Sequence, residues 1–140
     1  MKTAFIIIDV QNILVETGFE TEKLLEKIAY LQDQARKQQI EIIYMQHIET
    51  PEALTSEDWQ LSPLLKRQEN EKVFQKQYNS MFKETGLKEY LDQQGIQQLV
   101  LCGMQTEYCV DTSVKVGFEY GYKLVIPEGA VTTFDGEDIP

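Results

Sequence analysis

Residues 99–110 read Leu-Val-Leu-Cys-Gly-Met-Gln-Thr-Glu-Tyr-Cys-Val, and this stretch predicts a buried strand that turns sharply into a helix. The apolar run 99–102 is typical of a strand, and Gly103 allows the backbone to turn where that strand ends. Thr106 is the expected N-cap, which places Cys109 in the first helical turn. Small and apolar residues at helical spacing then predict a helix that continues over 110–117.

Cys109 has two interpretations. A thiol at a helix N-terminus faces the positive end of the helix dipole and unpaired N–H groups, which favour the thiolate. The same N–H groups could hold an oxyanion. A free cysteine is, however, more often a small core hydrophobe, so the choice depends on the rest of the chain.

The composition predicts one globular domain spanning residues 1–140. The chain is 42% hydrophobic and has 23 acidic against 13 basic residues, for a net charge of -10. Such a charge repels phosphate backbones and anionic membranes, so we expect no nucleic-acid partner and no membrane partner. We expect a cytoplasmic protein, since the sequence shows no signal peptide or membrane-spanning run and its two cysteines suggest no disulfide framework.

Predicted strands and helices alternate along the chain. Strands are expected over 4–8, 40–45, 72–75, 99–102 and 122–126, and helices over 21–39, 85–91 and from 106 onward. Continuous apolar runs such as 4–8 fit strands that are covered on both faces. This order predicts an α/β fold, a three-layer α/β/α sandwich with a mostly parallel sheet. Residues 48–71, with two prolines and many charges, are expected to form a lid or binding loop.

Asp9 follows the first expected strand, and Lys76 follows the third. Ligands of an open parallel sheet bind beyond the carboxyl ends of the strands, where the strand order reverses. If the first and fourth strands are neighbours, Asp9, Lys76 and Cys109 face one pocket. There Lys76 would lower the pKa of the thiol, Asp9 would take up and return its proton, and Cys109 would attack an amide carbonyl to form a thioester. The competing interpretation of Asp9 is a loop carboxylate that caps a backbone N–H.

His47 is the only histidine and follows the second expected strand. A catalytic zinc or iron normally needs several His, Cys or carboxylate ligands, so we expect no metal and no other cofactor. His47 is expected either at a pocket rim or as a strand-end residue without a role.

Trp59 could line a substrate pocket, or it could be a surface anchor of the loop 48–71. From residue type alone, the expected partner is a small, partly planar amide, and the residues expected to shape its pocket are Gln11, Phe19, Trp59, Tyr78, Phe82 and Tyr108.

Several blocks of the sequence resemble a known superfamily. The chain is similar to the isochorismatase-like cysteine hydrolases, which include nicotinamidases and N-carbamoylsarcosine amidases. The matching blocks are 5–12, 76–87, 99–110 with its Gly-x-x-Thr-x-x-Cys-Val motif, and 121–125. This resemblance implies an Asp9–Lys76–Cys109 catalytic triad. It also implies a non-proline cis peptide at Met104–Gln105 that aims the Gln105 and Cys109 amides at an oxyanion.

Two of the departures from the superfamily bear on the expected chemistry and on the length of the domain. The metal-binding Asp and His pair typical of nicotinamidases is not matched, because only His47 stands there, and this favours a metal-independent amidase. Superfamily members usually continue with another helix and a final strand, whereas this sequence stops at Pro140. We therefore expect a C-terminally short domain without those two elements. We also expect a homodimer or higher homo-oligomer.

Two other functions remain open. A phosphoryl-accepting receiver domain is also an acidic α/β unit, but it needs clustered acids to hold Mg²⁺, and Asp9 has no acidic sequence neighbour. A non-catalytic interaction module would suit the short C-terminus. Alkylation of the thiols separates these functions: for a hydrolase, Cys109 should react much faster than Cys102, with a pKa below that of a free thiol.

Overall fold

The strand β1 (Thr3–Ile8) lies in the middle of the sheet, and all but its first residue are buried. The structure, a computed structural model, describes residues 1–135. The strands lie in the order β3-β2-β1-β4-β5, with β6 also paired to β4, and every pairing is parallel. The other strands are β2 (Glu41–His47), β3 (Lys72–Lys76), β4 (Gln98–Met104), β5 (Lys123–Val125) and β6 (Val131–Thr132). The predicted parallel α/β sheet is therefore confirmed.

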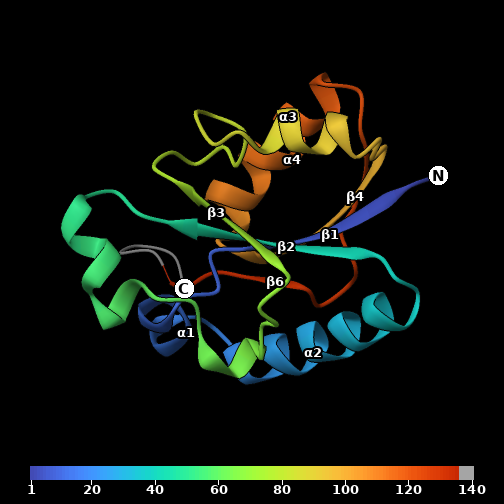
Figure 1. The fold of residues 1–140 in the computed structure, drawn as a ribbon. Coiled ribbons are helices and arrows are strands. Elements are labelled where there is room, and N and C mark those ends of the chain that lie inside the picture. The colour runs from blue at the N-terminus through green and yellow to red at the C-terminus, as the bar shows by residue number, and fades with distance from the viewer. Residues whose placement is uncertain (136–140) are drawn as a thin grey trace.

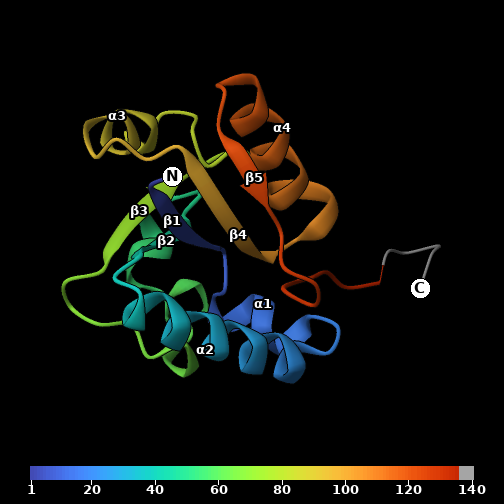
Figure 2. The ribbon, with the colours of Figure 1, turned by 90° about the vertical axis from the view of Figure 1, so that its right-hand side faces the viewer.

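Helices cover both faces of this sheet (Figures 1 and 2). On one face lie α1 (Asn12–Thr17) and α2 (Thr21–Lys37), and on the other lie α3 (Leu87–Gln93) and α4 (Asp111–Glu119). Successive side chains of a strand point to opposite faces, so Ile6 and Ile8 enter one apolar core while Phe5 and Ile7 enter the other. A strand buried in this way needs apolar residues without alternation, which explains the continuous apolar sequence of β1.

The strand order reverses between β1 and β4, and this reversal positions the site. From β1 the chain adds β2 and β3 on one side, and then β4 and β5 on the other. Ile8 pairs with Gly103 at the ends of the two strands. Gly103 has a φ of +123°, and a Cβ there would lie 2.0 Å from the Ile8 carbonyl oxygen. Only glycine allows this close approach, which brings the residues after β1 beside those after β4.

Residues 48–71, expected to form a lid or binding loop, contain three short 3₁₀ helices. These are η1 (Pro51–Thr55), η2 (Glu57–Trp59) and η3 (Pro63–Leu65). Backbone hydrogen bonds tie the segment to the β1–α1 junction, from Asn12 N–H to the Gln60 carbonyl at 3.0 Å and from Ser62 N–H to the Val10 carbonyl at 2.9 Å. The segment is therefore fixed beside the carboxyl end of β1.

Several predicted boundaries are wrong. The helix α1 was not predicted, since its six residues are too few to show a helical period. β2 runs two residues beyond its predicted end, and β3 includes Lys76. The helix α2 ends at Lys37, two residues before its predicted end. Thr106 begins a π-helical turn, Thr106–Val110, whose N-cap is Gln105.

The carboxyl-terminal part of the chain adds one unpredicted strand. The two-residue β6 pairs with Gly103 and Met104 of β4, beyond the end of β5. Residues 136–140 lie outside the described residues. Within residues 1–135, no helix combines the length and apolar character needed to cross a bilayer.

Candidate active site

Lys76, the last residue of β3, contacts three side chains from distant parts of the chain. Its ammonium nitrogen lies 3.0 Å from Asp9 Oδ2, 3.2 Å from Cys109 Sγ and 3.1 Å from His47 Nδ1. It also donates to the Tyr78 carbonyl at 2.8 Å. Lys76 and Asp9 are each only 2% exposed. The structure thus brings the three residues predicted from the strand ends together, and it adds His47 to them.

The Lys76 contacts determine where the proton of His47 lies. An ammonium group can only donate, so Nδ1 of His47 must accept. The proton therefore sits on Nε2, which lies 2.9 Å from Glu49 Oε1 and donates to it. In this arrangement the imidazole is neutral and connects the buried ammonium to an exposed carboxylate.

Gln11 positions the strand ends around this site. Its side-chain Nε2 donates to the His47 carbonyl at 3.0 Å and to the Trp59 carbonyl at 2.6 Å, and its Oε1 accepts from the His47 amide at 2.8 Å. Gln11 is itself fully buried. It was predicted to shape the pocket directly, but its contacts are with backbone, so it fixes the positions of His47 and Trp59 instead.

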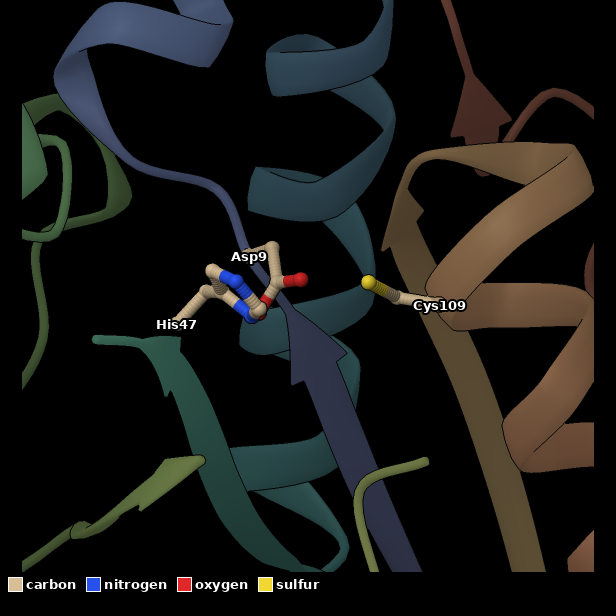
Figure 3. A group of neighbouring side chains, drawn as sticks. All are labelled: Asp9, His47 and Cys109. Carbon is tan, nitrogen blue, oxygen red and sulfur yellow. The ribbon is translucent and has the colours of Figure 1, made fainter. Parts of the chain in front are cut away.

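Cys109 lies in the π-helical turn that joins β4 to α4. The peptide between Met104 and Gln105 is cis, at the position that the resemblance implies. The amides of Tyr108 and Val110 both donate to the Gln105 carbonyl, which closes the turn. Figure 3 shows the Cys109 sulfur, from the α4 side, facing Asp9 and His47, which extend from the ends of β1 and β2.

Burial and the charge of Asp9 together raise the pKa of Cys109 to about 12, and the nearby Lys76 only partly offsets them. The expected pKa below that of a free thiol is therefore wrong, because the strand-end prediction counted the ammonium but not desolvation or the carboxylate. Burial also raises the pKa of Asp9, with Lys76 opposing the shift. Cys109 thus holds a proton at neutral pH, and the Asp9 carboxylate lies within 4.8 Å of its sulfur.

One oxygen of Asp9 is available to accept that proton. Oδ2 is paired with Lys76, whereas Oδ1 is buried and has no hydrogen-bond partner among residues 1–135. A buried acceptor without a partner is costly. Among residues 1–135 neither oxygen accepts from a backbone N–H, so the alternative of a capping carboxylate is not supported.

A cavity of about 300 Å³ opens onto Asp9 and Cys109. Trp59 and Tyr108 line it as expected. Sequence reasoning missed three of its lining residues: Leu14, Glu49 and Asn79. His47, for which a pocket rim and a strand end without a role were both expected, lines the cavity. The position of Glu49, two residues after His47 at a strand end, is a signal that could have identified it. Asn79 lies within the matching block 76–87, and its Oδ1 is 3.8 Å from Cys109 Sγ.

Three residues expected in the pocket lie elsewhere. Phe82 packs in the core against Tyr122, with stacked rings 6.0 Å apart. The side chain of Tyr78 lines a neighbouring cavity of about 380 Å³. Phe19 is 62% exposed, and its amide donates to the Thr133 carbonyl. Aromatic residue type alone could not distinguish these environments from an active-site wall.

Asp9, His47 and Cys109 could in principle hold a metal ion, because their donor atoms lie within 4.8 Å of one another. The Lys76 ammonium nitrogen, however, contacts all three donor groups at 3.0, 3.1 and 3.2 Å. A cation already occupies the point where these donors converge. With Lys76 in place, the residues do not fit a metal ion at that point.

Comparison with known proteins identifies the family. The Isochorismatase domain model matches residues 3–139. The chain is 28% identical over 138 residues to the streptothricin hydrolase of Streptomyces noursei. The alignment covers 94% of this chain and 50% of that protein, so this chain spans about half the length of the relative. It is 28% identical to the isochorismatase family protein YddQ of Bacillus subtilis, covering 95% of this chain and 79% of YddQ.

Solved structures agree with this assignment. The crystal structure of an isochorismatase family protein has a TM-score of 0.93 and 28% identity, with 99% of this chain and 85% of the other covered. An isochorismatase from Pseudomonas putida KT2440 has a TM-score of 0.89 and 29% identity, with 99% and 75% covered. Because the domain model matches nearly the whole sequence and the sheet and site have the arrangement described above, this chain belongs to the isochorismatase family.

Proposed function

We propose that this protein is a cysteine hydrolase that cleaves the C–N bond of a small amide through a thioester on Cys109. One observation carries the proposal: a single buried ammonium, Lys76 Nζ, lies 3.0 Å from Asp9 Oδ2 and 3.2 Å from Cys109 Sγ. Family membership and the similarity to the streptothricin hydrolase of Streptomyces noursei support hydrolysis as the reaction class.

In the proposed first step, the sulfur of Cys109 attacks the amide carbonyl while Asp9 accepts the thiol proton. The resulting tetrahedral intermediate collapses as Asp9 returns that proton to the departing nitrogen, so an amine or ammonia leaves and a thioester remains. In the second step, Asp9 takes a proton from water, and the hydroxide attacks the thioester carbonyl. The carboxylic acid is released, and the proton on Asp9 returns to the sulfur.

Lys76 keeps the buried charge balanced during these transfers. Before proton transfer the positive ammonium faces a carboxylate and a neutral thiol, and afterwards it faces a neutral carboxyl group and a thiolate. The net charge of the three groups is unchanged, and the negative charge moves only between two atoms that both contact Lys76. Such a fixed cation stabilises the transition state without reorganising solvent.

We assign the backbone amides of Gln105 and Cys109 as the hydrogen-bond donors to the oxyanion of the tetrahedral intermediate. Support comes from the position of Gln105 at the N-cap of the turn Thr106–Val110 and of Cys109 within that turn, because both residues line the cavity. Backbone amides held in place in this way are effective oxyanion donors.

The proposal can be tested by incubating the protein with a panel of small primary amides and measuring released ammonia. We expect Cys109→Ala to retain the wild-type circular dichroism spectrum and to lose hydrolysis. Cys102→Ala is the matched control, because Cys102 is a fully buried β4 residue of the opposite core; it should stay active. Turnover by Cys109→Ala would remove the nucleophile assignment.

A further inference from the structure

We infer that the active-site cavity selects substrates that carry a positive charge, and that Glu49 is the residue that determines this selectivity. The inference rests on the proposed hydrolase function, because it names the substrate class of that same site.

The charges around the cavity favour a cation. The nine lining residues include two carboxylates, Asp9 and Glu49, and no lysine or arginine. Asp9 is already neutralised by Lys76, which lies buried behind it at 3.0 Å. The remaining charge on the wall is therefore the carboxylate of Glu49. An anionic substrate would meet this negative charge without a lining cation to pair with, whereas a cationic one would be attracted.

Glu49 is held at the cavity by the hydrogen bond from the neutral His47 ring. His47 Nε2 lies 2.9 Å from Glu49 Oε1, and His47 Nδ1 lies 3.1 Å from the Lys76 ammonium nitrogen. A carboxylate has about four lone-pair sites, and the His47 bond uses one of them. The Glu49 side chain is 71% exposed, so it can accept a substrate ammonium group at the solvent side of the cavity.

Aromatic rings complete a surface suited to a cation. Trp59 and Tyr108 line the same cavity as Glu49, and the ring centroids of His47 and Trp59 are 6.2 Å apart. Ammonium groups are attracted to the faces of Trp and Tyr rings, and the attraction adds to that of a nearby carboxylate. The net charge of -10 further favours the approach of cations over anions.

Trp59 also supplies a binding signal, because it is the single tryptophan of the chain and lines the cavity. Three probes of similar size and different charge are benzylammonium, benzyl alcohol and benzoate. Titration of each probe into the wild-type protein at low ionic strength, followed by tryptophan fluorescence, gives three dissociation constants. We expect benzylammonium to bind about tenfold more tightly than benzoate, with benzyl alcohol between them.

In Glu49→Gln the preference of benzylammonium over benzoate should fall to about twofold, since the wall then carries no unpaired negative charge. Glu52→Gln is the matched control. It removes the same charge from an exposed residue of η1 that does not line the cavity, and it should keep the preference. Equal or tighter binding of benzoate to the wild type would overturn the inference. So would a Glu49→Gln variant that keeps the full preference, or no fluorescence response to benzylammonium in the millimolar range.

Ammonia release from 4-(aminomethyl)benzamide, 4-(hydroxymethyl)benzamide and 4-carbamoylbenzoate separates this inference from the proposed function. Hydrolysis without a preference for the cationic amide would overturn the selectivity and leave the hydrolase intact. Selective binding of benzylammonium without hydrolysis of any amide would leave the selectivity intact and count against the hydrolase.

Discussion

The ammonium nitrogen of Lys76 lies 3.0 Å from Asp9 Oδ2, and the exposed fractions of the two side chains are 0% and 2%. Taking two charges out of water is costly, and their attraction repays this cost only while both partners are present. The pair is therefore a structural unit as well as the centre of the proposed chemistry.

Lys76→Met should lower the free energy of unfolding by about 3 kcal/mol, because it leaves the Asp9 carboxylate buried without its cation. The double variant Asp9→Asn/Lys76→Met should recover part of this loss, since neither charge then remains. Urea denaturation of the wild type, both single variants and the double variant measures the coupling. A double variant that is less stable than either single variant would contradict a direct charge pair.

The raised pKa of Cys109, about 12, predicts an unusual pH dependence of alkylation. At neutral pH the group is a thiol, so its reaction with iodoacetamide should keep accelerating as the pH rises above 9, where an activated cysteine would already have reached a plateau. Mass spectrometry of samples quenched at a series of pH values measures this rate. A plateau near neutral pH would show that Cys109 is a thiolate and that the Lys76 charge outweighs burial.

Cys102 is the internal reference for that measurement. It is fully buried in β4, and burial raises the pKa of its thiol well above the usual value. It should remain unlabelled in the folded protein, whereas Cys109 lines the cavity and should react. Equal labelling of the two thiols would contradict the described site.

The convergence of donors on Lys76 predicts a latent metal site. Lys76→Ala removes the ammonium that lies between Asp9, His47 and Cys109, whose donor atoms remain within 4.8 Å of one another. Carboxylate, imidazole and thiolate are all zinc ligands, so the variant should bind Zn²⁺ more tightly than the wild type does. Isothermal titration calorimetry tests this, with His47→Ala/Lys76→Ala as a control that should lose the gain. Equal Zn²⁺ affinity of the wild type and Lys76→Ala would contradict the view that Lys76 occupies this point.

The sequence predicted the sheet and the meeting of Asp9, Lys76 and Cys109, because both depend on strand order and on where each strand ends. Continuous apolar runs determine which strands are buried, and a parallel sheet gathers their carboxyl ends at one edge. These are properties of the backbone path. A polar residue that directly follows a buried strand can therefore be placed near the site from the sequence alone.

The sequence could not predict which way side chains point within loops or how deeply they are buried. Phe82 and Trp59 are both aromatic and both lie outside strands, yet one packs in the core and the other lines the cavity. The pKa of Cys109 was predicted in the wrong direction for the same reason, since desolvation depends on the packing of the whole structure. His47 and Glu49 line the cavity because β2 continues to His47, two residues beyond the end that its apolar residues indicate.

Gly103→Ala should be among the most damaging single substitutions in this chain. Gly103 combines a φ of +123° with a close approach of β1, and a Cβ there would lie 2.0 Å from the backbone oxygen of Ile8. Backbone cannot move aside as a flexible side chain can, so β1 and β4 would have to separate next to Asp9. We expect a loss of at least about 4 kcal/mol in the free energy of unfolding, or failure to fold.

Gly95→Ala separates the effect of the close contact from that of the backbone conformation. Gly95 also has a positive φ, +69°, but no atom lies within 4 Å of the position a Cβ would take. This control should cost only about 1 kcal/mol, the penalty for placing alanine in a left-handed conformation. Urea denaturation of both variants compares the two losses. If Gly103→Ala proved as stable as Gly95→Ala, β1 and β4 could not approach as closely as described, and the cavity beyond their ends would have a different shape.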